Sequence, residues 1–313
     1  MTAVAHPNIA LVKYWGKRDR PLNLPAVPSL SLTLDGYRTR TTVWWGVERD
    51  EIVLNGSTVD DPKIRRTLDL LDPARPPCRV ESDNDFPTGA GLASSASGFA
   101  ALVVAASAAS GVTRTTHELS VLARRGSGSA CRSLYGGFVE WPLGTRADGA
   151  DSAGVPLAPA DHWDVAMVVA IVTDGPKAVG STEGMERSRA TSPYWDTWVA
   201  LGPTAVAEGR RAVLARDLEA LGVVMERSTF AMHATMHSAT PPLLYFQPAS
   251  IALLHEVFAL RARGVGAWAT LDAGPQVKVL CAAADVEVVR VALAPHALRV
   301  VAHRPGGPAR VTP

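Results

Sequence analysis

The sequence predicts an α+β protein with two domains. Segments with strand periodicity and segments with helical spacing both occur along the chain, and together they suit a mixed architecture of two packed layers. No internal repeat or heptad run is present. A chain of 313 residues is long enough for two cores. The Gly-, Asp- and Pro-rich stretch 144–159 predicts a loop, and close to it a boundary that divides the chain into residues 1–163 and 164–313.

The composition is typical of a globular protein, with 47% hydrophobic and 19% charged residues. Lys and Arg total 31 against 30 for Asp and Glu, so no global positive field attracts nucleic acid or an anionic membrane. The first residues do not form a secretory signal, and Cys78, Cys131 and Cys281 form no Cys-x-x-Cys pair. We therefore expect a cytoplasmic protein with reduced thiols.

The first 130 residues begin as strands and continue as helices. Three segments have the alternation or the β-branched and aromatic content of strands: 29–34, 39–45 and 51–54. The Ser-Leu alternation of the first predicts a half-buried strand, and Asn55-Gly56 after the third predicts a hairpin turn. Two segments have helical spacing: 63–71 and 116–124. Thr115 or Thr116 is placed to cap the second helix.

Residues 86–113 carry no charge and are numerous enough to cross a bilayer. Their middle is Ala, Gly and Ser, and Pro87 and two glycines would break a spanning helix at its start. This stretch therefore predicts a buried helix that begins near Leu92.

The second half alternates predicted strands and helices. The strands are 136–141, 164–172, 267–271 and 277–281, and the helices are 203–225 and 251–263.

Residues 87–96, Pro-Thr-Gly-Ala-Gly-Leu-Ala-Ser-Ser-Ala, form a glycine-rich turn that leads directly into a helix. Glycines let the backbone approach a phosphate, and a helix N-terminus offers unpaired N–H groups with partial positive charge. The Gly-Lys-Ser/Thr of a Walker A loop is missing. The segment indicates a loop for nucleotide phosphates, and the alternative is a helix of small residues packed closely for steric reasons.

Residues 124–133 form a second Gly- and Ser-rich loop, flanked by arginines. Flexible donors between guanidinium groups suit a phosphorylated or carboxylated substrate, because Arg binds either anion with two hydrogen bonds. A solvated basic loop is the alternative.

Single residues add to these loops. Asp272 follows an apolar strand and precedes Ala-Gly-Pro, so it can orient a substrate hydroxyl or accept its proton, or it can simply start the turn. Near the N-terminus, Lys13 and Lys17 can neutralise phosphates and Tyr14 can donate a hydroxyl, although a charge run is ordinarily a solvated face.

His233 and His237 are spaced to share a helix face. They lack the Glu of a zinc protease motif, so no metal ligand is assigned to the chain.

Together these segments resemble the galactokinase, homoserine kinase, mevalonate kinase and phosphomevalonate kinase (GHMP) superfamily, and within it the mevalonate diphosphate decarboxylases. The matching blocks stand in the family's order: 8–18, 86–98, 125–141, 180–185, 233–242 and 272–275. The resemblance implies an N-terminal domain like the second domain of ribosomal protein S5 and a ferredoxin-like C-terminal α/β sandwich. It also implies an active site between the domains, and a homodimer.

The implied reaction uses ATP and Mg²⁺ to phosphorylate the 3-hydroxyl of mevalonate 5-diphosphate. Loss of phosphate and carbon dioxide then gives isopentenyl diphosphate in isoprenoid biosynthesis. By the same resemblance Asp272 orients or deprotonates the hydroxyl, Arg132 holds the carboxylate, and Lys13 lies near the transferred phosphoryl group. The 5-diphosphate is assigned to Tyr14, Lys17, Ser127, Gly128 and Ser129. The ATP phosphates are assigned to Gly89, Gly91, Leu92, Ala93, Ser94 and Ser95.

The sequence departs from the family pattern at three places. Val27-Pro28 stands where Asn-Ser is usual, Gly89 replaces an Ala, and Asp85 replaces an Asn. These changes leave open whether the substrate carries a 5-diphosphate or a 5-phosphate.

Two further alternatives remain. One is a small-molecule kinase of the same superfamily that releases no carbon dioxide, and the other is a catalytically silent nucleotide or metabolite sensor. A residue that binds the substrate carboxylate, as Arg132 is expected to do, is needed only by a decarboxylase. A silent sensor would not need Asp272 and Lys13.

Overall fold

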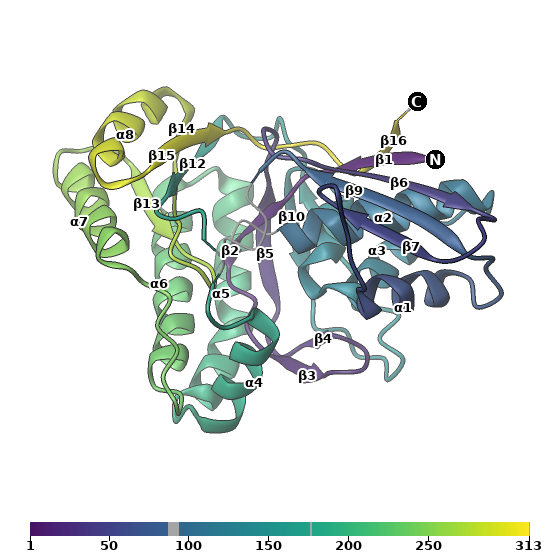
Figure 1. Cartoon of the computed structure of the whole chain (residues 1–313). Helices are drawn as coiled ribbons and strands as arrows, with labels where there is room; N and C mark the ends of the chain where they lie inside the picture. Colours follow the sequence, from purple (N-terminus) through teal and green to yellow (C-terminus); the bar gives the residue numbers. More distant parts are fainter. Residues whose placement is uncertain (87–93, 176, 313) are drawn as a thin grey trace.

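The computed structural model describes residues 1–86, 94–175 and 177–312. Figure 1 shows two lobes side by side, with the N-terminal half on the right and the C-terminal half on the left. Strands β2 and β5 lie between them. The mixed α+β prediction is confirmed.

The N-terminal lobe contains a six-stranded sheet in the order β16-β1-β6-β9-β7-β8. Its strands are β1 (Thr2–Ala5), β6 (Thr39–Trp45), β7 (Glu51–Leu54), β8 (Ser57–Thr58), β9 (Cys78–Asn84) and β16 (Arg310–Thr312). The predicted hairpin is confirmed, because Asn55 (φ 48°) and Gly56 (φ 76°) both adopt the left-handed conformation between β7 and β8.

Three helices accompany this sheet: α1 (Pro62–Leu71), α2 (Ser94–Ser110) and α3 (Thr116–Gly126). The charge-free α2 is a buried helix, as predicted, and it packs against β1 and β6. Its predicted start near Leu92 lies outside the described residues. Thr115 is the N-cap of α3 and forms a capping box with Glu118.

A four-stranded sheet, β11-β10-β5-β2, forms the centre of the molecule. Its strands are β2 (Asn8–Val12), β5 (Ser29–Thr33), β10 (Phe138–Trp141) and β11 (Val155–Ala158). Two predictions are wrong here. The stretch 144–159 is not a loop throughout, because it contains β11. Strand β5 is not half-buried, because the serines on one of its faces are buried as well as the leucines on the other. A short hairpin, β3 (Lys17–Asp19) with β4 (Leu24–Pro25), follows β2.

The C-terminal lobe has a four-stranded antiparallel sheet in the order β13-β14-β12-β15. Its strands are β12 (Val165–Ile171), β13 (Ala267–Thr270), β14 (Val277–Ala282) and β15 (Arg299–His303). The helices are α4 (Ser181–Thr191), α5 (Trp195–Ala215), α6 (Leu218–His237), α7 (Pro248–Ala262) and α8 (Val286–Leu293). The single helix predicted at 203–225 is two helices, because Arg216 adopts φ 56° and Asp217 caps α6 by accepting from Ala220 N at 2.9 Å.

The two lobes share one core cluster. Leu11 of β2 and Leu32 of β5 belong to the same buried cluster as Met167 of β12 and Leu221 of α6. The last strand, β16, returns to pair with β1, so both chain ends lie in the N-terminal sheet. The domain division at residues 163 and 164 stays a prediction. The segment after residue 303 leaves the C-terminal lobe and joins the N-terminal sheet through β16. Within the described residues, no helix is long and apolar enough to span a membrane.

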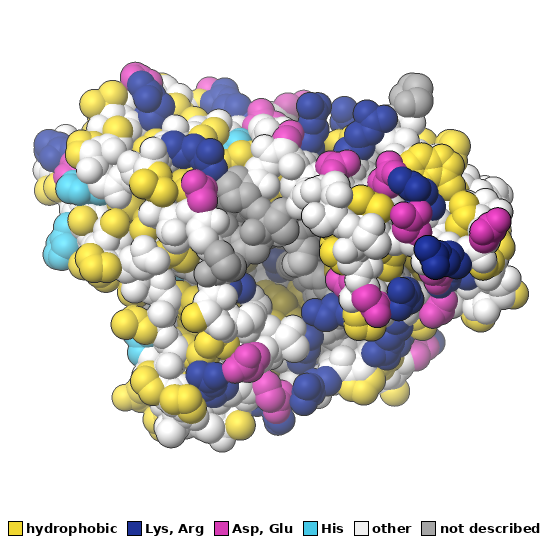
Figure 2. All heavy atoms as spheres, in the orientation of Figure 1, with side chains coloured by type: hydrophobic (Ala, Val, Ile, Leu, Met, Phe, Trp, Pro, Cys, Tyr) yellow, Lys and Arg dark blue, Asp and Glu magenta, His cyan; other side chains and the backbone are white. Residues whose placement is uncertain are grey.

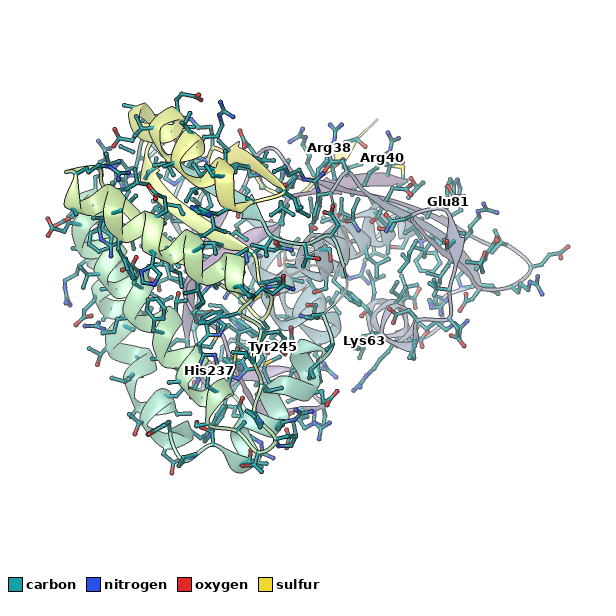
Figure 3. All side chains as sticks on the ribbon, turned by 60° about the vertical axis from the view of Figure 1, so that its left-hand side comes forward. Arg38, Arg40, Lys63, Glu81, His237 and Tyr245 are labelled. Carbon is teal, nitrogen blue, oxygen red and sulfur yellow. The ribbon has the colours of Figure 1, made fainter. Side chains whose placement is uncertain are left out.

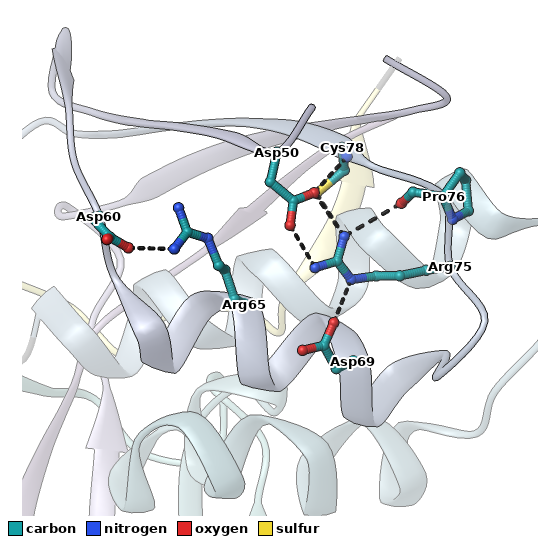
Figure 4. A network of polar contacts seen from close by, with 7 residues as sticks. All are labelled: Asp50, Asp60, Arg65, Asp69, Arg75, Pro76 and Cys78. Carbon is teal, nitrogen blue, oxygen red and sulfur yellow. Dashed lines mark hydrogen bonds and ion pairs between the residues drawn. The ribbon is translucent and has the colours of Figure 1, made fainter. Parts of the chain in front are cut away.

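An ionic network anchors the loop between α1 and β9 (Figure 4). The Arg75 guanidinium donates to both carboxylate oxygens of Asp50 at 2.8 Å and to Asp69 at 2.8 Å. The backbone N–H of Cys78 donates to Asp50 at 2.9 Å. Hydrogen bonds from Arg75 lower the pKa of the Asp50 carboxyl to about 2, against the opposing effect of burial.

Replacing Asp50 by Asn should reduce the free energy of unfolding at neutral pH by about 1–2 kcal/mol, because a charged acceptor of several hydrogen bonds is lost. The folded pKa of Asp50 is depressed, so its contribution is complete above the unfolded pKa of about 4 and is lost as pH falls toward the folded value. Thermal unfolding of both forms between pH 2 and 7 measures this. Asp60→Asn is the control, because its bond to Arg65 is exposed. An equal stability loss in both variants would contradict the prediction.

Candidate functional site

A carboxylate held by two lysines lies where β2, β13 and β14 come together. Lys13 directly follows β2, Asp272 is in the turn after β13, and Lys278 is on β14. The Lys13 Nζ donates to one carboxylate oxygen at 2.6 Å and the Lys278 Nζ to the other at 3.0 Å. Both lysine side chains are at most 1% exposed, whereas that of Asp272 is 27% exposed. The carboxylate is thus the member of the group that solvent reaches.

The charges of this group alter one another. Burial lowers the pKa of Lys13 to about 8, although Asp272 opposes that shift. Burial alone would raise the pKa of Asp272, but Lys13 and Lys278 outweigh it and hold that pKa well below its usual range. Asp272 therefore stays ionised and is a weak base.

The segment after Lys13 is anchored in the C-terminal lobe. The indole N–H of Trp15 donates to Ser188 of α4 at 3.0 Å, and that of Trp198 in α5 donates to the Trp15 carbonyl at 2.9 Å. Lys13 and Trp15 are buried, so this part of the basic and aromatic segment 13–18 is not a solvated face.

Arg132 lies on η1, a 3-10 helix over Gly128–Leu134. Its Nε donates to Asn8 Oδ1 at 3.0 Å, its Nη1 donates to the Ser29 hydroxyl, and its guanidinium lies 5.9 Å from the centre of the Trp141 ring. The side chain is buried and interacts electrostatically with Asp272 and Lys13. The structure therefore brings Arg132 to the same site as Lys13 and Asp272.

The prediction of a flexible loop at 124–133 is wrong. Residues 124–126 end α3, and η1 follows almost directly. Arg124 is fully buried and donates to the carbonyls of Leu22, Gly149 and Ser152, so it holds loops together. Cys131 is buried, and burial raises its thiol pKa to about 12, so it is unsuited to act as a nucleophile.

An aromatic wall stands beside Arg132. The rings of Tyr14 and Trp141 lie 4.7 Å apart, and both approach Gly128 so closely that an added Cβ there would meet each of them at 2.8 Å. The Tyr14 hydroxyl is buried with no hydrogen-bond partner among the described atoms. A buried hydroxyl without a partner is costly, and a ligand oxygen would satisfy it.

The two serine-rich segments of the sequence meet in space. The Ser95 hydroxyl, in the first turn of α2, lies 3.2 Å from that of Ser127, which precedes η1. Ser129 belongs to η1, where its carbonyl accepts from Asn8 Nδ2 at 3.0 Å. Ser94 begins α2. The remaining residues assigned to the nucleotide, Gly89, Gly91, Leu92 and Ala93, lie outside the described residues.

A group of cations lies near Lys17 of β3. Burial, then the charges of Lys63 and Arg20, lower the Lys17 pKa to about 8. Arg125 and Arg66 are likewise close enough to influence each other. Figure 2 shows Lys and Arg side chains gathered around a hollow in the middle and lower part of this face. Such a group favours a polyanionic ligand.

Sequence reasoning missed three polar side chains of the site. Lys278 interrupts the apolar strand 277–282, a signal that could have been used. Lys177 donates to the Ala273 carbonyl at 3.2 Å and to Ser181 at 2.7 Å, and no sequence pattern links it to Asp272. Asn8 holds both Arg132 and the η1 backbone.

The departure at Val27-Pro28 is packed against the C-terminal helices. Val27 is fully buried in a cluster with Trp15 and Trp198, and an added Cβ on Gly202 of α5 would lie 3.0 Å from the Val27 side chain. An apolar pair at this position thus suits its neighbours.

The two histidines of α6 pack against an aromatic side chain. His233 and His237 have ring centres 5.8 Å apart and pack on Phe246. The described part of the chain contains no group of three or more His, Cys, Asp or Glu side chains suited to a metal. Tyr245, which Figure 3 labels together with His237, donates its hydroxyl hydrogen to the Val179 carbonyl at 3.0 Å.

A hollow of about 670 Å³ lies on the side of the N-terminal sheet where Figure 3 labels Arg38 and Arg40. Asp35 and Asp85 also line it, and Asp85 pairs with Arg38 at 3.0 Å. Lys13, Asp272 and Arg132 are not among the described residues that line it.

Comparison with known proteins decides the family. Residues 5–154 match the diphosphomevalonate decarboxylase-like N-terminal domain, and residues 167–301 match the mevalonate 5-diphosphate decarboxylase C-terminal domain. The chain is 40% identical to diphosphomevalonate decarboxylase mvd1 of Aspergillus fumigatus, over 92% of this chain and 78% of that relative. The chain belongs to the diphosphomevalonate decarboxylase family.

Other members of the decarboxylase family agree with this assignment. The human diphosphomevalonate decarboxylase is 38% identical over 88% of this chain and 75% of its own. The solved mevalonate diphosphate decarboxylase of Staphylococcus aureus has a TM-score of 0.93 at 35% identity, covering 100% of this chain and 97% of that one. A complex described as MDDEF with MVAPP, AMPPCP and magnesium has a TM-score of 0.92 at 38% identity, covering 99% and 98%. The predicted family and its GHMP-kinase-like two-domain fold are confirmed.

Removing the Asp272 charge should lower the pKa of Lys13 below about 8, because burial, Lys278 and Arg132 then act without the opposing carboxylate. The chain has only five lysines, so NMR titration of labelled lysine side chains in the wild type and Asp272→Asn measures this directly. Asp174→Asn is the control, because Asp174 pairs with Arg299 at an exposed position. A Lys13 titration that is unmoved by Asp272→Asn would show that the pair does not exist in solution.

Proposed function

We propose that this chain catalyses the ATP-dependent decarboxylation of mevalonate 5-diphosphate to isopentenyl diphosphate. The observation that carries the proposal is the ionised Asp272 between Lys13 and Lys278, with Arg132 close by, in a chain of the decarboxylase family. A solved relative with 38% identity is described in complex with MVAPP, AMPPCP and magnesium. The enzyme class and both substrates follow from that kinship.

The geometry favours orientation over proton abstraction as the role of Asp272. A carboxylate whose pKa is held this low is a poor general base, but its exposed edge can accept a hydrogen bond from the substrate 3-hydroxyl. Phosphoryl transfer with a loose transition state depends mainly on positioning and charge stabilisation. Lys13, when protonated, supplies positive charge beside the transferred group.

Arg132 would hold the substrate carboxylate. Two of its nitrogens are used by Asn8 and Ser29, which fixes the plane of the guanidinium before the substrate arrives. Phosphorylation makes the 3-oxygen a leaving group, its departure leaves positive charge at C3, and the electrons of the carboxylate–carbon bond fill that centre as carbon dioxide leaves. The orienting role of Arg132 keeps that bond aligned.

The residues near α2 fit ATP with Mg²⁺. The Ser94 and Ser95 hydroxyls, at the beginning of α2, are suited to phosphate oxygens, and Ser95 lies beside Ser127, which we assign to the substrate 5-diphosphate. Mg²⁺ usually keeps several waters and binds substrate phosphates, so a set of hydroxyls without a carboxylate cage is compatible with it. When bound, the ion neutralises charge on the ATP phosphates.

The cations around Lys17 favour the 5-diphosphate over the 5-phosphate. Lys17, Lys63 and Arg20 lie close together, and Tyr14 offers an unpartnered hydroxyl. A diphosphate carries more negative charge to balance such a group than a monophosphate does.

Three expectations from the sequence remain proposals: the homodimer that the family resemblance implies, the cytoplasmic location, and the domain division at residues 163 and 164. The family-domain matches, which end at residue 154 and begin again at 167, support a division in that interval.

Asp272→Asn should lower turnover roughly 10²- to 10⁴-fold while the KM values change little, because the group acts on the reacting hydroxyl. The assay records ADP and carbon dioxide together, with mevalonate, its 5-phosphate and its 5-diphosphate offered separately with Mg-ATP. Asp174→Asn, which removes an exposed carboxylate, is the matched control.

Each outcome of this assay separates the alternatives. ADP and carbon dioxide in equal amounts with the 5-diphosphate supports the proposal, and the same result only with the 5-phosphate would reassign the substrate. ADP without carbon dioxide indicates a kinase. Binding of ATP and substrate without turnover indicates a sensor.

Binding of mevalonate 5-diphosphate at pH about 8.5 should be accompanied by proton uptake. The neighbouring polyanion should raise the pKa of Lys17 above the value of about 8 that it has in the substrate-free protein. Calorimetry in two buffers of different ionisation enthalpy measures the uptake. Lys17→Met should remove much of it and weaken binding. Arg18→Met is the control, because it also removes a positive charge close to Lys17 in the sequence, and Arg18 donates to the carbonyls of Leu143 and Gly144. Equal uptake in Lys17→Met and the wild type would exclude Lys17 as a diphosphate ligand.

A further inference from the structure

We propose that one turn of α6 sets the distance between Lys13 and Asp272, through Ser228 and Thr229 acting as positioning residues. The inference deepens the proposed function and rests on it for its kinetic consequence.

Ser228 holds the Lys13 end of the pair. Its hydroxyl accepts from the backbone N–H of Lys13 at 2.9 Å, and both residues are at most 4% exposed. Lys13 is the first residue after β2, where no sheet partner determines the path of the chain. This hydrogen bond therefore decides where the lysine leaves the central sheet.

Thr229 holds the Asp272 end. Its hydroxyl lies 2.9 Å from that of Thr270, and both side chains are fully buried. Thr270 is the last residue of β13, two residues before Asp272. Because neither hydroxyl has access to water, the bond between them is expensive to leave unmade.

These two contacts are made by consecutive residues of one helix. Their Cα atoms are about 3.8 Å apart and cannot move independently within a hydrogen-bonded helix. One contact is to Lys13 itself, directly after β2 of the central sheet, and the other is to Thr270 of β13 in the C-terminal sheet, two residues before Asp272. A shift of about 1 Å in a reacting geometry can cost 10²-fold in rate, so a rigid spacer at this point has a direct effect on the reaction.

The next turn of α6 keeps the surroundings uncharged. His233 is 1% exposed and packs on Phe246 with ring centres 4.4 Å apart. Burial, then the charge of Lys13, lowers its pKa to about 3, so it is neutral at physiological pH. The charged groups that influence Lys13 are therefore Asp272, Lys278 and Arg132.

Thr229 is a better site for a test than Ser228. A cavity of about 140 Å³ between α5 and α6 is lined by Ser228 and Lys13, so water can replace a lost serine hydroxyl. Neither Thr229 nor Thr270 is among the residues that line it. The test therefore uses Thr229→Val, together with the double variant Thr229→Val/Thr270→Val, in which no buried hydroxyl is left unpaired.

Both variants should lower kcat for carbon dioxide release about 10- to 100-fold with KM values within about twofold of the wild type. In the substrate-free protein, the NMR titration of Lys13 should move to lower pH, because a looser pair gives less support from Asp272. Thr229→Ser, which keeps the hydroxyl, should restore both values.

Thr235→Val is the matched control. Thr235 is fully buried on the same helix, and its hydroxyl donates to the Met232 carbonyl of that helix. Wild-type kcat and an unmoved Lys13 titration in the folded double variant would overturn the inference, as would equal effects in Thr235→Val. Absence of carbon dioxide release from the wild-type protein would instead refute the proposed function, and the titration would still decide the role of Thr229.

Discussion

The attraction of Lys13 and Lys278 for one carboxylate is the constraint on which the site depends. Two fully buried ammonium groups would be very costly alone, and Asp272 compensates both with one hydrogen bond each. Lys13 and Asp272 are 259 residues apart in the sequence and arrive from different sheets. The pair therefore forms only when the central sheet and the C-terminal sheet are packed together.

The shared core explains how the lobes meet in that arrangement. Apolar side chains of β2 and β5 belong to the same cluster as those of β12, α5 and α6, so the central sheet is buried against the C-terminal helices. Polar contacts from Trp15 and Ser228 then direct the chain as it leaves β2. Non-directional packing brings the elements together, and a few buried hydrogen bonds determine the final geometry.

The site has two sides with different chemistry. One side consists of the Tyr14 and Trp141 rings, which approach Gly128, and of the cations near Lys17. On the other, the first turn of α2 presents Ser95 to Ser127. Asp272 and Arg132 belong to the centre, where a hydroxyl and a carboxylate of one substrate would both be held. This division suits a reaction in which two anionic substrates must approach without sharing the same positive groups.

The sequence by itself determined the local elements and the residues whose chemistry stands out. Asn55-Gly56, the Thr115 cap and the charge-free helix α2 are all local, because turn geometry, capping and burial of apolar segments depend on near neighbours. Motif order also identified the family and pointed to Asp272 and Arg132.

Only the tertiary structure decided which charged residues serve the site and which serve the fold. Arg124 and Arg132 look alike in the sequence, yet one binds loop carbonyls and the other joins the site. Lys278 and Asn8 became visible as members of the site only through partners far away in the chain. The physical reason is that burial and ion pairing depend on what surrounds a side chain in space, and periodicity along one strand or helix does not contain that information.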